Sequence, residues 1–241
     1  MADEGFTHPR LAAIYDALEP DRGDLDAYVR MVEEFGARRV LDIGCGTGVF
    51  ALLLAGRGID VVGVDPALAS LDVARGKPGS ERVRWIHGDA SGLPPLRVDL
   101  ATMTANVAQQ IVEADAWRET LRGAYRALRP GGRLVFETRD PAWRAWEEWN
   151  REASYAVTDV PGVGVVESWV DVIGVDGQLV SFRWSYLFAS DGRTLTSDST
   201  LRFREREEVE AELVARGFVV EDVRDAPDRP GKELVFVARR P

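Results

Sequence analysis

Three closely spaced glycines and an aspartate stand out in the segment Val40-Leu41-Asp42-Ile43-Gly44-Cys45-Gly46-Thr47-Gly48. An apolar strand runs into the glycines, and a helical pattern follows at once. Glycine at this spacing lets the backbone approach a ligand, because a side chain would collide with it and a tight turn can need a positive φ. A carboxylate at position 42 would repel a pyrophosphate and suit a cation. The segment predicts a nucleotide-binding crossover.

The glycine order separates two kinds of nucleotide site. A dinucleotide fingerprint needs G-x-G-x-x-G, whose third glycine packs the helix against its strand. Val49 stands where that glycine would fall. An NAD-dependent oxidoreductase is therefore the less favoured interpretation.

Five segments between Val40 and Thr138 resemble, in order, the motifs of the class I S-adenosylmethionine-dependent methyltransferases. An acidic residue before G-x-G-x-G resembles the first motif, and "VVGVDPALASLDVAR", "VRWIHGDASGLP", "VDLATMTANVAQQI" and "ALRPGGRLVFET" resemble the next four. The resemblance implies an α/β fold with a doubly wound, mostly parallel seven-stranded sheet (Rossmann-like). It also implies S-adenosylmethionine as cofactor and methyl transfer to N or O of a small molecule. A non-catalytic S-adenosylmethionine-binding protein would retain the same motifs and remains an alternative.

Ligands of open α/β sheets lie beyond the carboxyl ends of the strands. The resemblance implies that Asp65 accepts hydrogen bonds from the ribose hydroxyls and that Asp89 and Ala90 contact the adenine. A helix cap at Asp65, a loop cap at Asp89, and acceptance from the glycine turn by Asp42 are the alternatives. The expected cofactor-binding residues are Tyr15, Asp42, Gly44, Cys45, Gly46, Thr47, Gly48, Asp65, Pro66, Asp89, Ala90, Thr104 and Ala105.

Methyl transfer from a sulfonium needs in-line placement of the nucleophile, and a base helps only for some acceptors, so no catalytic residue is assigned. The residues expected at the acceptor are Asn106, Gln109, Glu137, Arg139 and Trp184. The segment at Asn106 lacks an Asn/Asp-Pro-Pro-Tyr signature, which disfavours methylation of DNA bases or protein glutamine. Surface ion pairing is the alternative for Glu137 and Arg139.

Composition limits the partners. Forty acidic residues against 30 basic ones give a net charge of -10, which disfavours nucleic acid as a partner. No apolar run approaches the roughly 20 residues of a membrane span, and the start does not resemble a signal peptide. We expect a cytoplasmic protein, a monomer or homodimer, without membrane or nucleic-acid partners. Cys45 is expected to fill space, and the two histidines cannot form a metal cluster, so no metal site is expected.

Alternating short apolar runs and helical stretches predict the parallel sheet, with strands at 38–43, 60–64, 83–87, 100–103 and 133–138. A helix capped by Asp115 and ended by Pro130-Gly131-Gly132 precedes the fifth strand. The resemblance adds an antiparallel hairpin of 219–223 and 233–238. The expected parts are an N-terminal helical cap (1–36), a cofactor-binding core (37–140), a helix with a β insert (141–204) and a C-terminal helix with the hairpin (205–241).

The insert carries two Asp-Gly pairs, at 176–177 and 191–192, which are strong signals for tight hairpin turns. They predict a three-stranded antiparallel sheet that acts as a lid. Alternation puts Phe182, Trp184, Tyr186 and Phe188 on one face, either as packing or as the roof of a substrate pocket. Three tryptophans at 143, 146 and 149 are expected on one side of a helix.

Overall fold

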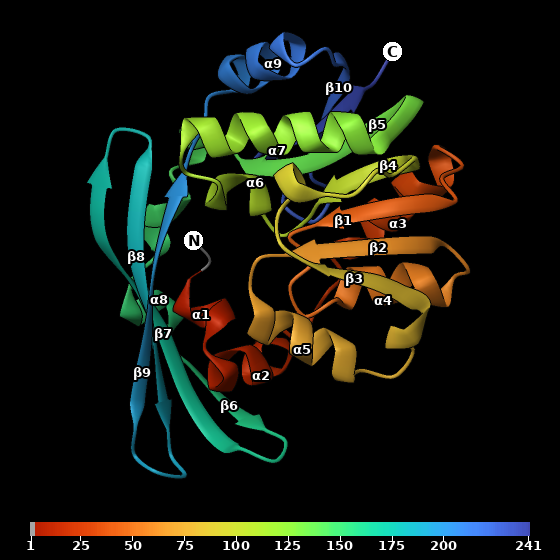
Figure 1. Cartoon of the computed structure of the whole chain (residues 1–241). Coiled ribbons are helices and arrows are strands. Elements are labelled where there is room, and N and C mark those ends of the chain that lie inside the picture. The colour runs from red at the N-terminus through yellow and green to blue at the C-terminus, as the bar shows by residue number, and fades with distance from the viewer. Residues whose placement is uncertain (1–2) are drawn as a thin grey trace.

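Two β-sheets stand side by side in the computed structural model, which describes residues 3–241 (Figure 1). The larger sheet has seven strands in the order β10-β11-β5-β4-β1-β2-β3, and the smaller has four in the order β6-β7-β8-β9. Residues 1 and 2, the start of the predicted N-terminal cap, lie outside the described residues.

The seven-stranded sheet is parallel from β3 through β5. The β10–β11 hairpin completes it, and β11 runs antiparallel to β5. This arrangement confirms the predicted doubly wound sheet and its terminal hairpin. The strands are β1 (Arg39–Ile43), β2 (Asp60–Asp65), β3 (Val83–His87), β4 (Val98–Met103), β5 (Leu128–Arg139), β10 (Val219–Asp225) and β11 (Glu233–Arg239).

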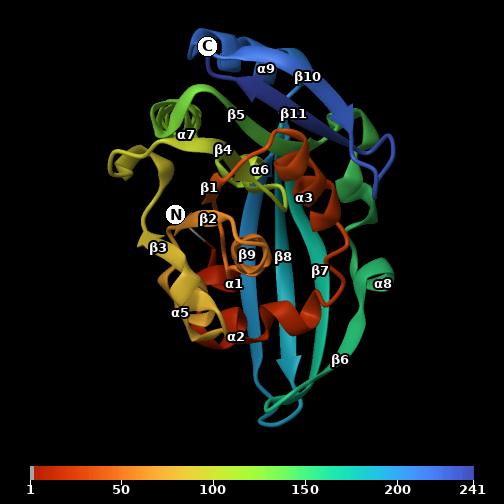
Figure 2. The ribbon, with the colours of Figure 1, turned by 90° about the vertical axis from the view of Figure 1, so that its right-hand side faces the viewer.

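Helices cover both faces of this sheet, because its parallel strands carry apolar side chains on both faces and need a cover on each side (Figures 1 and 2). On one face α3 and α4 pack Val29 and Leu54 against Val40 and Val135. On the other face α7 and α9 supply a second apolar layer, which includes Trp117. The main helices are α3 (Leu25–Glu34), α4 (Val49–Gly56), α5 (Leu68–Gly76), α7 (Ala114–Ala127) and α9 (Arg206–Ala215).

The predicted limits of α7 are wrong at both ends. Asp115 lies inside the first turn and does not cap the helix; its carboxylate pairs with Arg118 at 3.1 Å. The helix ends at Ala127, and Pro130-Gly131-Gly132 belongs to the beginning of β5. Gly132 fits there because a side chain would meet the backbone oxygens of Arg129 and Asp99.

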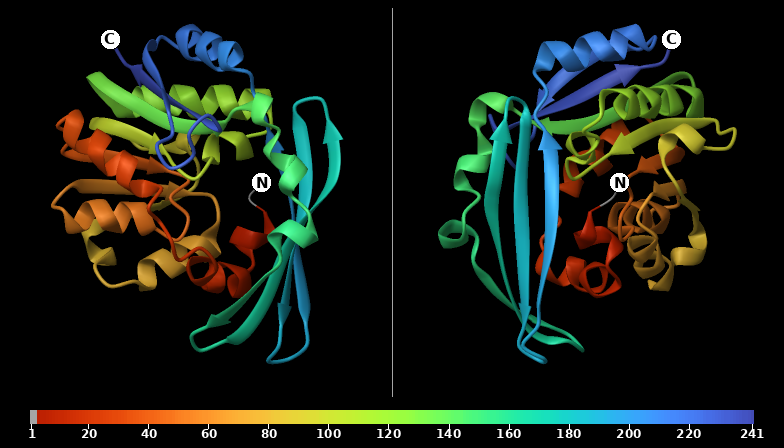
Figure 3. Two further views of the ribbon diagram at one scale, coloured as in Figure 1. Left: turned by 180° about the vertical axis from the view of Figure 1, so that it is seen from behind. Right: turned by 60° about the vertical axis from the view of Figure 1, so that its left-hand side comes forward.

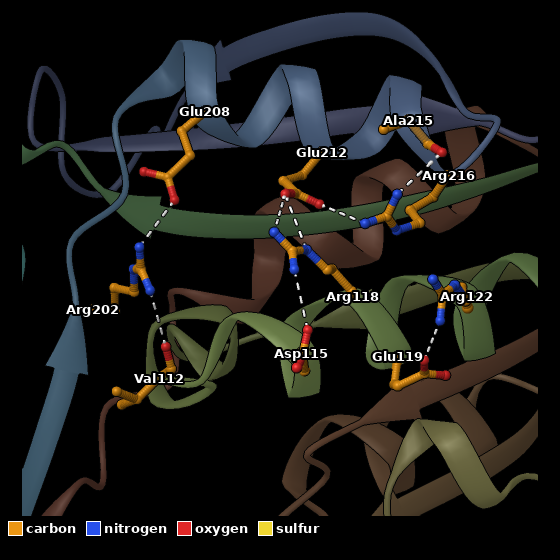
Figure 4. Close-up of polar contacts among 10 residues, drawn as sticks. All are labelled: Val112, Asp115, Arg118, Glu119, Arg122, Arg202, Glu208, Glu212, Ala215 and Arg216. Atoms are coloured by element: carbon orange, nitrogen blue, oxygen red, sulfur yellow. Dashed lines mark hydrogen bonds and ion pairs between the residues drawn. The ribbon is translucent and has the colours of Figure 1, made fainter.

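Polar contacts join α9 to α7 on one face of the sheet (Figure 4). Glu212 lies between Arg118 and Arg216, with N–O distances of 3.4 Å and 3.1 Å. Arg202, at the end of β9, pairs with Glu208 and donates to the carbonyl oxygen of Val112. These contacts tie the end of β9 to the helices of the core.

The smaller sheet, here called the insert sheet, has one strand more than the sequence predicts. Its strands are β6 (Ala156–Val160), β7 (Gly164–Asp176), β8 (Leu179–Phe188) and β9 (Thr194–Arg202). All neighbours pair antiparallel. The extra strand, β6, joins β7 through a turn at Pro161-Gly162, which carries no Asp-Gly signal.

The inner face of the insert sheet packs against the N-terminal helices α1 (Glu4–Thr7) and α2 (Pro9–Leu18), which lie between the two sheets (Figures 2 and 3). Phe188 contacts Leu11 and Ile14 in a buried cluster. The backbone N–H of Gly5 donates to Ser197 Oγ on β9 at 2.7 Å. The predicted one-sided array of β8 aromatics therefore packs largely against α2 and the 141–154 segment.

The predicted tryptophan helix is wrong. Residues 141–154 form two 3-10 turns, η3 (Pro141–Trp143) and η4 (Ala145–Glu148), followed by the short helix α8 (Arg151–Ser154). Arg144 lies between the turns in the left-handed region, with φ 50°, which breaks the helix. Trp146 and Trp149 still pack edge-on against Phe203 and Phe182, with ring centroids 4.6 Å and 4.8 Å apart.

Shorter turns complete the core. They are η1 (Ser80–Arg82), η2 (Ala90–Gly92) and α6 (Val107–Gln110). Within residues 3–241, no helix is long and apolar enough to cross a membrane.

Candidate functional site

A cavity of about 890 Å³ opens at the carboxyl ends of β1 to β4. Twelve of the thirteen predicted cofactor-binding residues line it, which the parallel topology explains because all these strands end at one edge of the sheet. They are Tyr15, Asp42, Gly44, Cys45, Gly46, Thr47, Asp65, Pro66, Asp89, Ala90, Thr104 and Ala105. Gly48 is outside the lining.

The three glycines of the turn have different roles. All three have positive φ angles, of 72°, 52° and 80° in chain order. A Cβ on Gly44 would lie 2.6 Å from the side chain of Val107, and one on Gly48 would lie 2.5 Å from Trp85. A Cβ on Gly46 would meet no protein atom within 4 Å. Gly44 and Gly48 therefore serve packing, while Gly46 leaves open space beside the cavity.

Asp42 is a buried carboxyl at the end of β1, only 1% exposed. It accepts a hydrogen bond from Thr102 Oγ1 at 3.2 Å. Burial raises the pKa of Asp42 to about 7; the neighbouring Asp65 also raises it, while Thr102 and Arg22 lower it. Asp42 does not accept from the glycine turn, so that alternative is wrong.

Asp65, at the end of β2, accepts from that turn instead. Its Oδ2 receives the N–H of Gly46 at 2.8 Å, and its Oδ1 receives the N–H of Ala67 at 2.7 Å. Asp65 is not the cap of α5, whose N-cap is Ala67. Each carboxyl oxygen can accept a further bond, so these two hydrogen bonds leave room for a diol. Burial raises the pKa of Asp65, and the two backbone N–H groups lower it.

Asp89 caps the turn η2 through Oδ1, which accepts from Ser91 N at 2.8 Å. The hydrogen bonds from Ser91 lower the pKa of Asp89, which is therefore a charged acceptor at the cavity wall. Ala90, beside it, is buried. On the far side of the cavity, Ala105 and Asn106 both have positive φ, at 56° and 59°. Such strain in non-glycine residues is concentrated at functional sites.

The glycine turn is tied to the N-terminal helices. Thr47 Oγ1 donates to Asp16 at 2.6 Å, and Lys77 Nζ donates to the Thr47 carbonyl oxygen and pairs with the same aspartate. Cys45 lines the cavity but is buried, and burial raises the pKa of its thiol well above the ordinary value. An un-ionised thiol is consistent with the predicted space-filling role.

A second, smaller cavity of about 170 Å³ lies beside the first, and Tyr15, Arg22 and Ala105 line both. Three predicted acceptor residues are in its lining: Asn106, Glu137 and Arg139. Glu137 and Asn106 are 6% and 4% exposed, and Glu137 Oε1 accepts the N–H of Asn106 at 2.8 Å. The ion-pair alternative for Glu137 is not what the geometry shows, since no ion pair within residues 3–241 includes it.

Two predicted acceptor residues line neither cavity. Gln109 is fully buried, and its Oε1 accepts from the backbone N–H and the guanidinium of Arg139, at 3.3 Å and 3.1 Å. It therefore positions Arg139. Trp184 stacks on Tyr186 in the insert sheet, with centroids 6.0 Å apart.

Sequence reasoning missed several lining residues. Arg22 stands between α2 and α3 and pairs with Asp24 at 3.1 Å. In the sequence, Arg22 is marked only as a basic residue within an acidic segment. A surface arginine would look the same. Phe6 and Ser70, also in the lining, are linked because Ser70 Oγ donates to the Phe6 carbonyl oxygen at 3.0 Å.

The lining suits a cationic nucleoside. Asp42 and Asp65 are buried, and no ion pair among the residues that the structure describes includes either. Their pKa values are raised by burial, so a positive charge in the cavity would favour their ionised forms. A pyrophosphate would be repelled by the same groups. Asp42, Asp65, Asp89 and the open face at Gly46 thus fit S-adenosylmethionine.

Residues 40–132 match the sequence model of a family described as "Methyltransferase domain". The cypemycin N-terminal methyltransferase of Streptomyces sp is 37% identical over 126 residues, which are 52% of this chain and 51% of that protein. The chain spans about half the length, or less, of the first curated relatives that it matches.

Several solved structures have the same fold as this chain over almost its whole length. An S-adenosylmethionine-dependent methyltransferase of Clostridium acetobutylicum has a TM-score of 0.75 at 19% identity, covering 96% of this chain and 98% of that one. The S-adenosylmethionine-bound amino pentose methyltransferase CalS10 of Micromonospora echinaspora has a TM-score of 0.70 at 24% identity, covering 95% and 97%. At such identities the likeness shows the fold. Residues 40–132 thus match a methyltransferase domain, and the whole chain has the fold of class I S-adenosylmethionine-dependent methyltransferases.

Proposed function

We propose that this protein transfers a methyl group from S-adenosylmethionine to an N or O atom of a small-molecule acceptor. The observation that carries the proposal is the large cavity, in which Asp42, Asp65 and Asp89 lie at the ends of three adjacent parallel strands beside an open glycyl backbone. Two of the similar proteins described above support a nitrogen acceptor, since one is named as an N-terminal methyltransferase and the other as an amino pentose methyltransferase.

In this proposal each part of the cofactor meets a group of matching chemistry. Asp65 accepts from the ribose hydroxyls, Asp89 and the backbone of Ala90 meet the adenine, and Asp42 and Tyr15 lie toward the methionine end. Bound S-adenosylmethionine supplies a methyl group on a positively charged sulfur, which leaves as a neutral thioether. The protein's own part is to hold the acceptor in line and to exclude water, which can supply roughly 7–11 kcal/mol.

Calorimetric titration with S-adenosylmethionine tests the binding half. The wild type should bind it, and Asp65→Ala should bind at least tenfold more weakly, because a charge-assisted hydrogen bond of about 1.5–3 kcal/mol is lost. Asp72→Ala removes an exposed carboxylate on α5 that lies outside the lining of both cavities, and serves as a matched control. NADH binding in place of S-adenosylmethionine would contradict the proposal.

A methyl-transfer screen over small amines, phenols and carboxylates tests the catalytic half, with S-adenosylhomocysteine as the measured product. Formation of this product with at least one acceptor is expected. Tight cofactor binding with no turnover across the screen would favour the non-catalytic alternative.

A further inference from the structure

The smaller cavity has a chemical character of its own. Six carboxyl groups line it against three guanidinium groups. The carboxyl groups belong to Glu19, Asp21, Asp24, Glu137, Asp228 and Glu233, and the guanidinium groups to Arg22, Arg139 and Arg229. An acidic lining of this kind favours a cationic ligand.

Most of the buried charge in this cavity is already compensated. Glu233 Oε1 lies 2.7 Å from Arg229, and Asp24 lies 3.1 Å from Arg22. Glu137 differs. Its one hydrogen bond within residues 3–241 comes from the backbone N–H of Asn106 and goes to Oε1, so Oε2 is left without a donor.

Asn106 presents a second open acceptor. Its Nδ2 donates to Glu233 Oε1 at 3.2 Å, which fixes the amide orientation, because the reverse orientation would set two oxygens against each other. Its Oδ1 is buried and has no partner among the described residues. Unsatisfied buried acceptors are costly, and the two open groups here both call for a donor. An ammonium group offers three N–H donors and a positive charge.

The cavity also lies where an acceptor must be. It spans the edge formed by the ends of β4 and β5 and the start of β11, next to the proposed cofactor cavity. Tyr15, Arg22 and Ala105 line both cavities, so the two adjoin at these residues. With about 170 Å³, the smaller cavity is below the 300–1,000 Å³ typical of whole ligands and takes one end of a molecule.

We propose that this cavity receives the protonated amino group of the methyl acceptor, an alkylamine, and that Glu137 takes its proton. The inference rests on the proposed function, since the amine is the acceptor in that reaction. The N–H bond breaks with its electron pair left on nitrogen, and the proton forms an O–H bond at Glu137 Oε2. In the resting complex the ammonium and the carboxylate form an ion pair. Proton transfer within this pair gives a neutral amine and a carboxylic acid, and the amine then has the free lone pair that methyl transfer requires.

The charges around Glu137 agree with a proton-accepting role. Burial raises the pKa of Glu137 to about 8, the Asn106 N–H lowers it, Glu233 and Asp24 raise it, and Arg139 lowers it. A carboxylate of this basicity accepts a proton from an ammonium more readily than an ordinary glutamate does. The other titratable or charged groups in the lining are Tyr15, Tyr28, Arg22, Glu19, Asp21, Asp228 and Arg229.

The first test uses wild-type protein and needs no variant. Propylammonium chloride and propan-1-ol, which are similar in size, are titrated at pH 7 and followed by calorimetry and by difference infrared spectroscopy. Propylammonium should bind and should reduce the carbonyl stretch of a protonated carboxyl group, because a cation favours the ionised form of Glu137. Propan-1-ol should do neither. Equal binding of the two probes, or no binding of propylammonium, would overturn the inference.

The second test compares Glu137→Gln with the matched change Glu210→Gln on the exposed face of α9. Glutamine keeps the acceptor for the Asn106 N–H but cannot carry charge. Glu137→Gln should lose propylammonium binding and the infrared change, and Glu210→Gln should keep both. Retained propylammonium binding in Glu137→Gln would overturn the inference.

S-adenosylmethionine titrations of the same proteins separate the two proposals. Glu137 is outside the lining of the larger cavity, so Glu137→Gln should still bind S-adenosylmethionine. Cofactor binding without amine binding by the wild type would sink this inference alone. Absence of cofactor binding in the wild type would sink the proposed function.

Discussion

Asp42 lies one residue before the end of β1, where it pairs with Gly63, and Asp65 ends the adjacent parallel strand β2; both are buried. Burial raises the pKa of each carboxyl group, and the nearby charge of Asp65 raises the pKa of Asp42 further. A cation in the cavity would lower the cost of ionising both. At the scale of single residues, the site is therefore sensitive to pH before any ligand enters.

The affinity for S-adenosylmethionine should increase as pH rises from 6 to 8. The pKa of Asp42 in the protein is about 7, so the carboxyl is mostly neutral at pH 6 and mostly ionised at pH 8. The gain should be about tenfold, which corresponds to about 1.4 kcal/mol. Calorimetry at several pH values, in buffers of different ionisation enthalpy, measures both the affinity and the protons released. Asp42→Asn should flatten the dependence, and an unchanged slope in that variant would contradict the assignment.

Alanine at Gly44 and at Gly46 should have opposite main effects. Gly44→Ala should lower the free energy of unfolding by about 2–4 kcal/mol, because the new Cβ collides with Val107 and the φ of 72° is strained. Gly46→Ala should cost only about 1–2 kcal/mol of strain and should weaken S-adenosylmethionine binding. Urea unfolding and calorimetric titration give the two quantities. Equal effects of both variants on stability would show that the open space at Gly46 is misassigned.

The order of the motifs was enough to predict most of the residues that line the larger cavity. Gly46, Asp65 and Asp89 follow strand ends, and the parallel topology brings these ends to one edge of the sheet. Arg22 could not, because its place in the lining depends on how the α2–α3 connection folds over the cavity. Burial of Glu137 was equally hidden, since it depends on residues nearly a hundred positions away in β11.

At the scale of elements, one buried arginine helps to attach the insert sheet to the core. Arg204 follows β9 directly and is only 2% exposed. Its guanidinium donates to the carbonyl oxygens of Ala108 and Ile111, in and just after α6, and lies 4.7 Å from the ring centre of Trp117. Burial lowers the pKa of Arg204 to about 10, which still leaves it charged at neutral pH.

Arg204→Met should lower the free energy of unfolding by about 3 kcal/mol, because two carbonyl oxygens lose a charged donor while the packing volume is largely kept. Arg206→Met, at the start of α9, removes an exposed surface pair with Glu210 and should leave the free energy of unfolding close to that of the wild type. Urea unfolding of both variants provides the comparison. Similar costs at the two positions would show that the buried contact is unimportant.

Element order was predictable where periodicity and turn chemistry agree. The parallel strands, α9 and the two Asp-Gly hairpins are such cases. Strand β6 was missed because a short strand with a Pro-Gly turn resembles a loop, and its stability comes from pairing with β7. The tryptophans at 143, 146 and 149 have helical spacing, but the turns of this segment let Trp146 and Trp149 pack against Phe203 and Phe182 without a helix, while Trp143 is exposed.

At the scale of the whole molecule, buried carboxyl groups couple the site to stability. The pKa values of Asp42, Asp65 and Glu137 are all raised in the folded protein. The folded state therefore holds protons that the unfolded state releases. Each group stabilises the fold fully below its unfolded pKa, and this contribution is lost as pH rises through the folded value. The buried carboxyl groups that suit a cationic ligand therefore lower the stability of the fold near neutral pH.

Glu137→Gln should therefore become more stable relative to the wild type as pH rises. Between the ordinary glutamate pKa of 4.5 and the folded value of about 8, the wild type loses the contribution of Glu137 at up to about 1.4 kcal/mol per pH unit. Glutamine does not titrate, so the difference in unfolding free energy between variant and wild type should shift by about 3 kcal/mol in favour of the variant. Urea unfolding at pH 5, 6, 7 and 8 measures it. Asp42→Asn should show the same sign with the change ending near pH 7, because its folded pKa is lower. A constant difference across this range would mean that Glu137 is ionised in the folded protein at every pH, and a shift of opposite sign would mean that a buried cation compensates it.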